Sequence, residues 1–169
     1  MTNEYVLRRQ VTRMDAHAIV HRNLPDAAPE CTELRHHPFV GFVHAVNHRM
    51  VTAEVSPLIH TLVDRFTGRP YLSDPWPGLT NRVDSMGLNE PTDPEWNAVS
   101  LNQARHNATR LIRTSLVRRL KLAHGHSLHE KQCLETVWKP NWVITASYRR
   151  RPLQVLVDAL TGGYYILGT

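Results

Sequence analysis

The sequence predicts an α+β fold made of two pseudo-repeats, each a helix followed by an antiparallel β-meander. The segments 62–71 and 156–165 share Leu-Val-Asp, then Thr-Gly and then a tyrosine, all at one constant spacing. We therefore expect a first repeat at 1–74, a linker loop at 75–92 and a second repeat at 93–169. A cysteine, a glutamate and a proline also match in the same order upstream, as Cys31, Glu33 and Pro38 against Cys133, Glu135 and Pro140.

Residues 4–22 should form the helix of the first repeat. The linker that follows this repeat is rich in Pro, Gly, Asn and Asp, which favour loops. Within the linker we expect Trp76 to hold the loop against a core. The apolar residues of the first helix recur at the spacing of one helical face, and they are Leu7, Val11, Met14, Ala18 and Ile19.

The helix of the second repeat has stronger signals. Asp93 is a suitable N-cap, and Pro94 suits the first helical position, where the chain does not need a backbone N–H. Gly125 lies where a glycine commonly ends a helix. The apolar residues between these signals again recur at helical spacing, and they are Leu101, Ala104, Ala108, Leu111, Ile112, Leu116 and Leu120.

The second meander is predicted from its side chains. Residues 133–140 and 142–148 are rich in β-branched and aromatic residues, which favours two strands. Pro140 lacks the N–H that a sheet ladder uses, so we expect a bend or an edge there. A third strand at 153–157 should end in a turn at 158–162, where Asp accepts backbone hydrogen bonds and Gly adopts positive φ. The sheets of the two repeats could stay separate or join edge to edge.

The strand, the Asp-x-x-Thr-Gly turn and the short strand that follows it resemble the PepSY-type module. The resemblance covers about 30 residues in each half of the chain and implies a non-catalytic binding, inhibitory or chaperone-like module. Modules of this type commonly act outside the cytoplasm. The residues that carry the resemblance are Val63, Asp64, Thr67 and Gly68, and Val157, Asp158, Thr161 and Gly162.

Composition excludes several classes of protein. With 169 residues, 41% hydrophobic and 21% charged, the chain is typical of a globular protein rather than a disordered one. The first residues lack the apolar core of a signal peptide, and no run of about 18 apolar residues predicts a membrane span. Two cysteines do not make a disulfide framework. We expect a soluble cytoplasmic protein with reduced thiols.

The basic residues are the candidate binding surface. The net charge is +5, which favours an acidic protein partner, a nucleic acid or another anionic surface. Trp142 and Tyr148, near the arginine cluster, could stack on the bases of a single strand. A solvated helix face and a polar turn explain the same pattern without a ligand. The predicted partner-binding residues are Arg149, Arg150, Arg151, Trp76, Arg118 and Arg119.

Two histidine-rich segments are candidate metal sites. Imidazole and thiolate groups suit zinc and similar ions, but the spacing of these residues matches no known mechanism, and a solvated loop is the alternative. The first segment supplies His124, His126, His129 and Cys133, and the second supplies His36, His37, His44 and His48 with Glu54.

The sequence favours a non-enzymatic module that binds another protein as an accessory, assembly or regulatory subunit. It contains no H-E-x-x-H motif, nucleophile elbow, phosphate-binding loop or dinucleotide fingerprint, so we assign no catalytic residue and no cofactor. A nucleic-acid-binding protein that uses the arginine surface is the second hypothesis. A metal-dependent enzyme that uses the histidine-rich segments is the third. Self-association into a homo-oligomer is left open.

Overall fold

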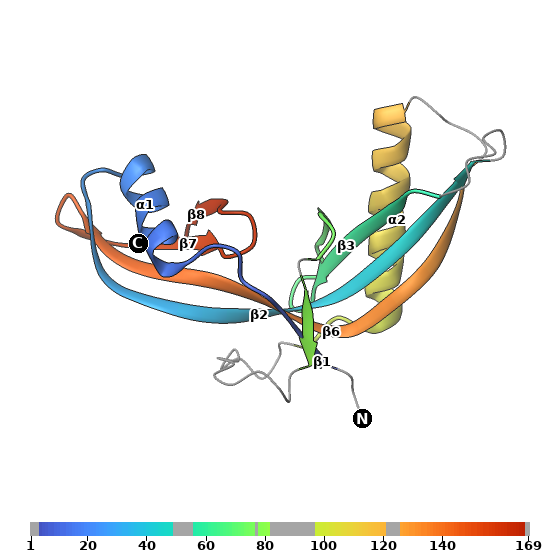
Figure 1. Ribbon diagram of the computed structural model, residues 1–169, viewed down its shortest axis with the longest axis horizontal. Helices are drawn as coiled ribbons and strands as arrows, with labels where there is room; N and C mark the ends of the chain where they lie inside the picture. The colour runs from blue at the N-terminus through green and yellow to red at the C-terminus, as the bar shows by residue number, and fades with distance from the viewer. Residues whose placement is uncertain (1–3, 49–55, 77, 82–96, 121–125, 168–169) are drawn as a thin grey trace. The chain divides into compact units, whose positions relative to one another are not determined.

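The computed structural model describes residues 4–48, 56–76, 78–81, 97–120 and 126–167. Figure 1 shows the strands and helices in these ranges. In chain order they are β1 (Glu4–Leu7), α1 (Arg13–Asn23), β2 (Ala27–His48), β3 (Leu58–Asp64), β4 (Pro70–Ser73), β5 (Leu79–Asn81), α2 (Leu101–Leu120), β6 (His126–Tyr148), β7 (Arg151–Asp158) and β8 (Tyr164–Ile166).

The chain forms two compact units, and each unit takes residues from both halves of the sequence. Unit 1 combines Pro38–Trp76 with Asp93–Val137, whereas unit 2 combines Val6–His37 with Trp138–Thr169. These units differ from the predicted division at 75–92. Each of the two longest strands, β2 and β6, contributes one part of its length to each unit.

The predicted pair of helix-and-meander repeats is wrong, although both helices and strands are present as expected of an α+β protein. The described strands form one eight-stranded sheet in which β2 pairs with β6, instead of two meanders. The strands run through Pro38 and Pro140 without ending, for 22 residues in β2 and 23 in β6. In consequence α1 packs on β7, and α2 packs on β3 and β4, so each helix covers strands from the other half of the chain.

The core of unit 2 lies between α1 and the sheet. Ala16 and Val20 of α1 are fully buried against alternate residues of β6 and β7. These include Ile144 and Val155, which are register partners and both fully buried. One face of these strands is therefore apolar because it is covered by the helix. Figure 1 shows α1 beside β7.

The predicted start of the first helix is wrong. Residues 4–7 form β1, and the helix begins only at Arg13. The Thr12 hydroxyl accepts a hydrogen bond from the Asp15 backbone N–H at 3.2 Å. The Asp15 carboxylate in return accepts one from the Thr12 N–H at 3.0 Å. This reciprocal capping box was readable in the sequence and marks the true start.

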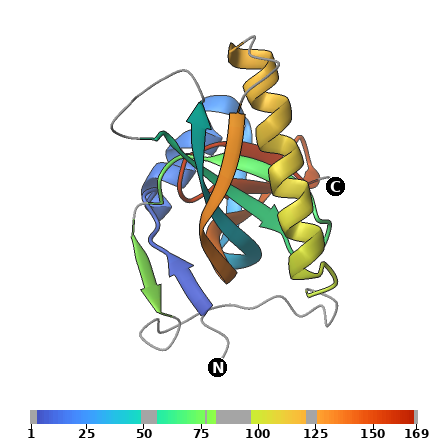
Figure 2. The same ribbon diagram turned by 90° about the vertical axis from the view of Figure 1, so that its right-hand side faces the viewer.

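The core of unit 1 lies between α2 and strands β2 and β3. Ala104 and Ala108 are fully buried against Val40, Phe42 and Val63. Figure 2 shows α2 lying along these strands. The small alanine side chains let α2 approach the sheet closely. The larger side chains of the sheet then fill the remaining space between the helix and the strands. No helix in the described ranges is long and apolar enough to cross a membrane.

The second helix starts later than predicted. Asp93, Pro94 and Gly125 lie outside the described residues, but residues 97–100 are not helical and α2 begins at Leu101. The Ser100 hydroxyl accepts a hydrogen bond from the Gln103 N–H at 3.2 Å, so Ser100 is the cap. All seven apolar residues of the predicted stripe, from Leu101 to Leu120, fall within α2.

The predicted aspartate turn is confirmed and occurs twice with the same hydrogen bonds. The Asp158 carboxylate accepts from the backbone N–H groups of Leu160 at 2.8 Å and Thr161 at 3.3 Å. Gly162 closes the turn with φ of 76°. The equivalent bonds to the Asp64 carboxylate come from the residues at 66 and 67, at 2.7 Å and 3.1 Å. Each turn is thus held by local hydrogen bonds to its aspartate carboxylate and by backbone bonds, such as the one from the Gly162 N–H to the Asp158 carbonyl at 2.9 Å.

Both turns are also tied to the prolines of the long strands. The Arg65 N–H donates to the Pro38 carbonyl at 3.1 Å, and the Ala159 N–H donates to the Pro140 carbonyl at 3.3 Å. In unit 2 the Lys139 ammonium adds an ion pair with Asp158 at 2.6 Å, with both side chains largely buried. A proline has no backbone N–H, but its carbonyl can still accept a hydrogen bond. In both long strands the turn supplies the donor to that carbonyl.

Trp76 holds its segment against the sheet, as the sequence predicted. A Cβ atom on Gly41 of β2 would lie 2.8 Å from the Trp76 ring, so the indole packs directly on the backbone of that strand. The ring also meets His60 edge to face, with centroids 5.2 Å apart. Trp76 is half-buried in this position. Its contacts therefore give it a structural role in unit 1.

We expect Gly41→Ala to lower the free energy of unfolding by about 1–3 kcal/mol, because the new methyl group overlaps the Trp76 ring. Urea unfolding of the whole chain measures this loss. Gly163→Ala is the matched control, because its added Cβ would meet no atom nearer than 3.5 Å. Equal stability of the two variants would contradict the packing of Trp76 on Gly41.

Candidate functional site

The turn between β6 and β7 presents three consecutive arginines. Tyr148 and Arg151 are register partners, so Arg149 and Arg150 form a two-residue hairpin loop. Their φ angles are 50° and 64°, both in the left-handed region. Two consecutive positive φ angles in a two-residue loop define a type I′ turn. We call residues 148–151 the arginine hairpin.

The turn of the arginine hairpin is strained. Type I′ turns favour Asn-Gly or Gly-Gly, because the left-handed conformation brings Cβ too close to a carbonyl oxygen in other residues. Arg149 and Arg150 each cost about 1–2 kcal/mol in this conformation. Strain of this kind at an exposed turn is a feature of functional sites, where the side chains matter more than local stability.

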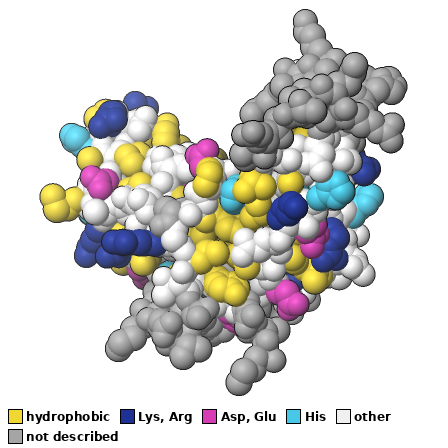
Figure 3. All heavy atoms as spheres, turned by 45° about the vertical axis from the view of Figure 1, so that its right-hand side comes forward, with side chains coloured by type: hydrophobic (Ala, Val, Ile, Leu, Met, Phe, Trp, Pro, Cys, Tyr) yellow, Lys and Arg dark blue, Asp and Glu magenta, His cyan; other side chains and the backbone are white. Residues whose placement is uncertain are grey.

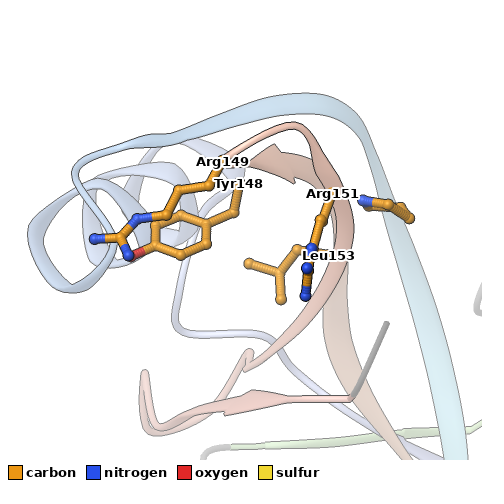
Figure 4. Close-up of a pocket in the computed structure, with 5 residues that line it drawn as sticks. Tyr148, Arg149, Arg151 and Leu153 are labelled. Atoms are coloured by element: carbon orange, nitrogen blue, oxygen red, sulfur yellow. The ribbon is translucent and has the colours of Figure 1, made fainter.

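A hollow of about 520 Å³ lies beside the arginine hairpin. Figure 4 shows its lining, with Arg149 drawn across the Tyr148 ring and Arg151 next to Leu153. The Arg149 guanidinium lies 5.2 Å from the centre of that ring, within the range of a cation–π contact. Pro152 and the largely buried Leu153 complete the lining. The hollow therefore combines an apolar floor with a cationic rim.

The charges of the arginine hairpin are not compensated within the described part of the chain. No ion pair there involves Arg149, Arg150 or Arg151, and all three residues are exposed. Arginine suits carboxylates and phosphates because its planar fork can donate two parallel hydrogen bonds. The site offers no described carboxylate, imidazole or thiol for proton transfer or nucleophilic attack. The exposed guanidinium groups could bind an anion.

Two of the other predicted partner-binding residues belong to the other compact unit and do not line this hollow. Trp76 and Arg118 lie in unit 1, whereas the arginine hairpin lies in unit 2. Arg118 is exposed near the end of α2, and the side chain of Arg119 is outside the description. The structure thus brings together Arg149, Arg151 and Tyr148, and it adds Pro152 and Leu153. The sequence suggested the arginines and Tyr148 but not the two aliphatic neighbours.

The first predicted metal set is not assembled in the described residues. His124 and the side chain of His126 lie outside them. His129 and Cys133 both belong to the extended strand β6, so their Cα atoms are about 13 Å apart at a rise of about 3.3 Å per residue. Nowhere in the described ranges do three His, Cys, Asp or Glu side chains converge as metal ligands would.

A different polar cluster lies under α2 in unit 1. His44 of β2 is only 3% exposed, and its Nδ1 atom has no hydrogen-bond partner among the described residues. Arg105 of α2 forms an ion pair with Glu130 of β6 at 2.7 Å. Burial raises the pKa of the Cys133 thiol, and the carboxylates of Glu130 and Glu135 raise it further. A thiol that keeps its proton is a poor nucleophile, so the cluster does not resemble an active cysteine site.

The second histidine segment is divided between the units. His36 belongs to unit 2 and His44 to unit 1. Burial lowers the pKa of both imidazoles. The side chain of His48 and all of Glu54 fall outside the description.

Comparisons with family models, with curated proteins and with solved structures find no match to this chain. The PepSY-type resemblance therefore stays a prediction.

We expect the double substitution Arg149→Asn with Arg150→Gly to raise the free energy of unfolding by about 1–3 kcal/mol, because it gives the turn residues that accept positive φ. Thermal and urea unfolding measure the gain. The same changes at two exposed helical arginines, Arg110→Asn with Arg113→Gly, are the control and should lower stability. A loss of stability at the hairpin would contradict the strained turn.

The buried imidazole of His44 should make stability depend on pH. Burial lowers its pKa below the ordinary value of 6.5, Arg105 lowers it further, and Glu130 partly offsets this. The folded protein therefore holds His44 neutral, while the unfolded chain binds a proton as the pH falls through about 6.5. Stability from this group is fully present above that pH and is lost as the pH falls towards the folded pKa.

We expect His44→Leu to reduce the fall in stability between neutral pH and about pH 5, because the substitution removes one of the buried titrating groups. The free energy of urea unfolding at several pH values measures the slope. His21→Leu, at an exposed histidine of α1, is the matched control for replacing an imidazole with leucine. If His44→Leu shows the wild-type slope, His44 does not titrate as its burial indicates.

Proposed function

We propose that this protein is a non-enzymatic accessory, assembly or regulatory subunit that binds an acidic segment of another protein through the arginine hairpin. The observation that carries the proposal is the strained turn, which places two arginines at positive φ beside a hollow with an apolar floor. We further propose that it acts in the cytoplasm, in line with its free cysteines, Cys31 and Cys133.

The lining of the hollow supports a partner that is both acidic and apolar. Arg149 and Arg151 supply exposed cations, while Leu153 and Pro152 supply apolar atoms to the same lining. A segment with Asp or Glu next to a leucine-like side chain matches both. The net charge of +5 also favours the approach of an acidic partner over a basic one.

The aromatic residues favour a protein over a single-stranded nucleic acid. Stacking of bases requires an open ring face. Arg149 covers the Tyr148 ring at 5.2 Å, and Tyr148 also packs against the core under α1. Trp142 is 6% exposed, with its indole N–H donating to the Val11 carbonyl at 2.9 Å. The two rings that could have supported stacking are thus already engaged within unit 2.

We expect Arg149→Glu, Arg150→Glu and Arg151→Glu together to weaken binding of an acidic probe about tenfold or more, because attraction is replaced by repulsion. The probe is a labelled peptide of alternating Glu and Leu, and its fluorescence anisotropy is measured with the whole chain. The matched control reverses Arg13, Arg110 and Arg113, which are exposed on the helices, so the net charge changes equally.

Three outcomes are distinguishable. Loss of peptide binding at the hairpin alone supports the proposal, and native mass spectrometry of protein recovered gently from its own cells then identifies the natural partner. Equal losses in both variants, or no peptide binding at low salt, overturn it. Binding of labelled oligothymidine in place of the peptide, with affinity falling steeply with salt, assigns the surface to nucleic acid.

A further inference from the structure

Strand β8 leaves one edge of the unit 2 sheet open. In the described residues β8 pairs only with β7. The Leu167 N–H donates to the Gln154 carbonyl at 2.8 Å, and the Asp158 N–H donates to the Gly163 carbonyl at 2.8 Å. Bonded pairs alternate along an antiparallel ladder. Because Gly163 and Leu167 face β7, the backbone groups of Tyr164 and Ile166 face away from it.

The open edge of β8 lacks the usual protection against pairing. Sheet edges are commonly blocked by proline, a charged side chain or a bulge. Residues 159–167 contain no proline and no charged residue. Among the described residues, the N–H groups of Tyr164 and Ile166 are therefore both available for a ladder with another strand.

Strand β4 shows the contrast within the same chain. Leu62 pairs with Tyr71 there, as Leu156 pairs with Tyr165 on β8. The Asp64 N–H donates to the Arg69 carbonyl at 3.0 Å, so the next residue, Pro70, faces away from β3. The position that corresponds to Tyr164 is thus a proline on β4, which cannot donate to an added strand.

The side chains of β8 are apolar and exposed. Tyr165 is 61% exposed, Ile166 54%, Leu167 51% and Tyr164 39%. Figure 3 shows apolar side chains, drawn in yellow, on the surface of the described part. Tyr164 and Ile166 pair with Val157 and Val155, so they continue the face of the sheet that α1 covers. The side chains of an added strand would lie beside these residues and continue the same face of the sheet.

We propose that β8 pairs with β8 of a second copy of this chain, antiparallel across a twofold axis at Tyr165. This register places Tyr164 opposite Ile166 of the other copy in both directions, so the outward N–H and carbonyl groups satisfy each other. The two Tyr165 side chains then lie directly opposite, with Cβ atoms about 4.5–5.5 Å apart. A strand without charge pairs with itself without repulsion, which an acidic or basic segment could not do.

The proposed pairing would give the edge of β8 a partner that it lacks among the described strands. A short strand buries less surface than the roughly 800 Å² per partner of stable interfaces, so the dimer is a weak, concentration-dependent one. The dimer is independent of what the arginine hairpin binds. It would place two arginine hairpins in one particle, which raises the effective affinity for a partner with two acidic segments.

Sedimentation velocity of the whole chain over a wide concentration range tests the proposal. We expect the wild-type mass to rise from 19.4 kDa towards twice that value with concentration. Tyr164→Pro should weaken dimerisation about tenfold or more by removing an outward N–H. Tyr164→Thr, which keeps that N–H, is the control for loss of the ring and should retain more of the dimer than the proline variant.

A second variant guards against a folding defect in the first. Tyr165→Lys places two like charges opposite each other at the twofold axis and should also favour the monomer. Tyr71→Lys makes the same change on the proline-protected strand β4 and should leave dimerisation as in the wild type. A wild-type chain that stays monomeric at all concentrations, or a dimer that survives both β8 variants, overturns the proposal.

Discussion

The pairing of β2 with β6 is the constraint on which both units depend. Each strand supplies one part of its length to each unit, so neither unit can be completed by one half of the chain. Contacts between residues far apart in sequence must form before either core is closed. This places the entropic cost of long-range closure early in folding and favours cooperative rather than stepwise assembly.

The two aspartate turns hold the remaining strands on this pair. Each turn is stabilised by its own side-chain hydrogen bonds and is then joined to the proline carbonyl of a long strand. In unit 2 the ion pair between Lys139 and Asp158 adds a charged contact in a largely buried place. Such a pair is valuable mainly because removing one partner would leave the other charge buried alone. The turns thus position β4 and β8 at two edges of the described sheet.

Unit 2 carries two surfaces of opposite chemistry on neighbouring strands. The arginine hairpin is charged and strained, with Arg149 and Arg150 held at positive φ by the pairing of Tyr148 with Arg151. Strand β8 is uncharged, with its outward backbone groups at Tyr164 and Ile166. Charge favours rapid encounter with an acidic partner, whereas an apolar open edge favours pairing with another strand. The two surfaces can therefore act independently.

Features set by neighbouring residues were readable from the sequence, and features set by distant residues were not. The turn at Asp158 follows from an aspartate whose carboxylate reaches the next backbone N–H groups, and the basic character of 149–151 is visible directly. The capping residues Thr12 and Ser100 were also readable, because a cap bonds within its own first turn. The strands on which each helix packs were not readable from the sequence. β-branched and aromatic residues favour a strand, but they do not indicate where it ends or which strand it pairs with. The strands β2 and β6 continue past Pro38 and Pro140 because they pair with each other, and this pairing is a tertiary feature. That same tertiary pairing placed His44 under α2 and fixed which backbone groups of β8 face outwards.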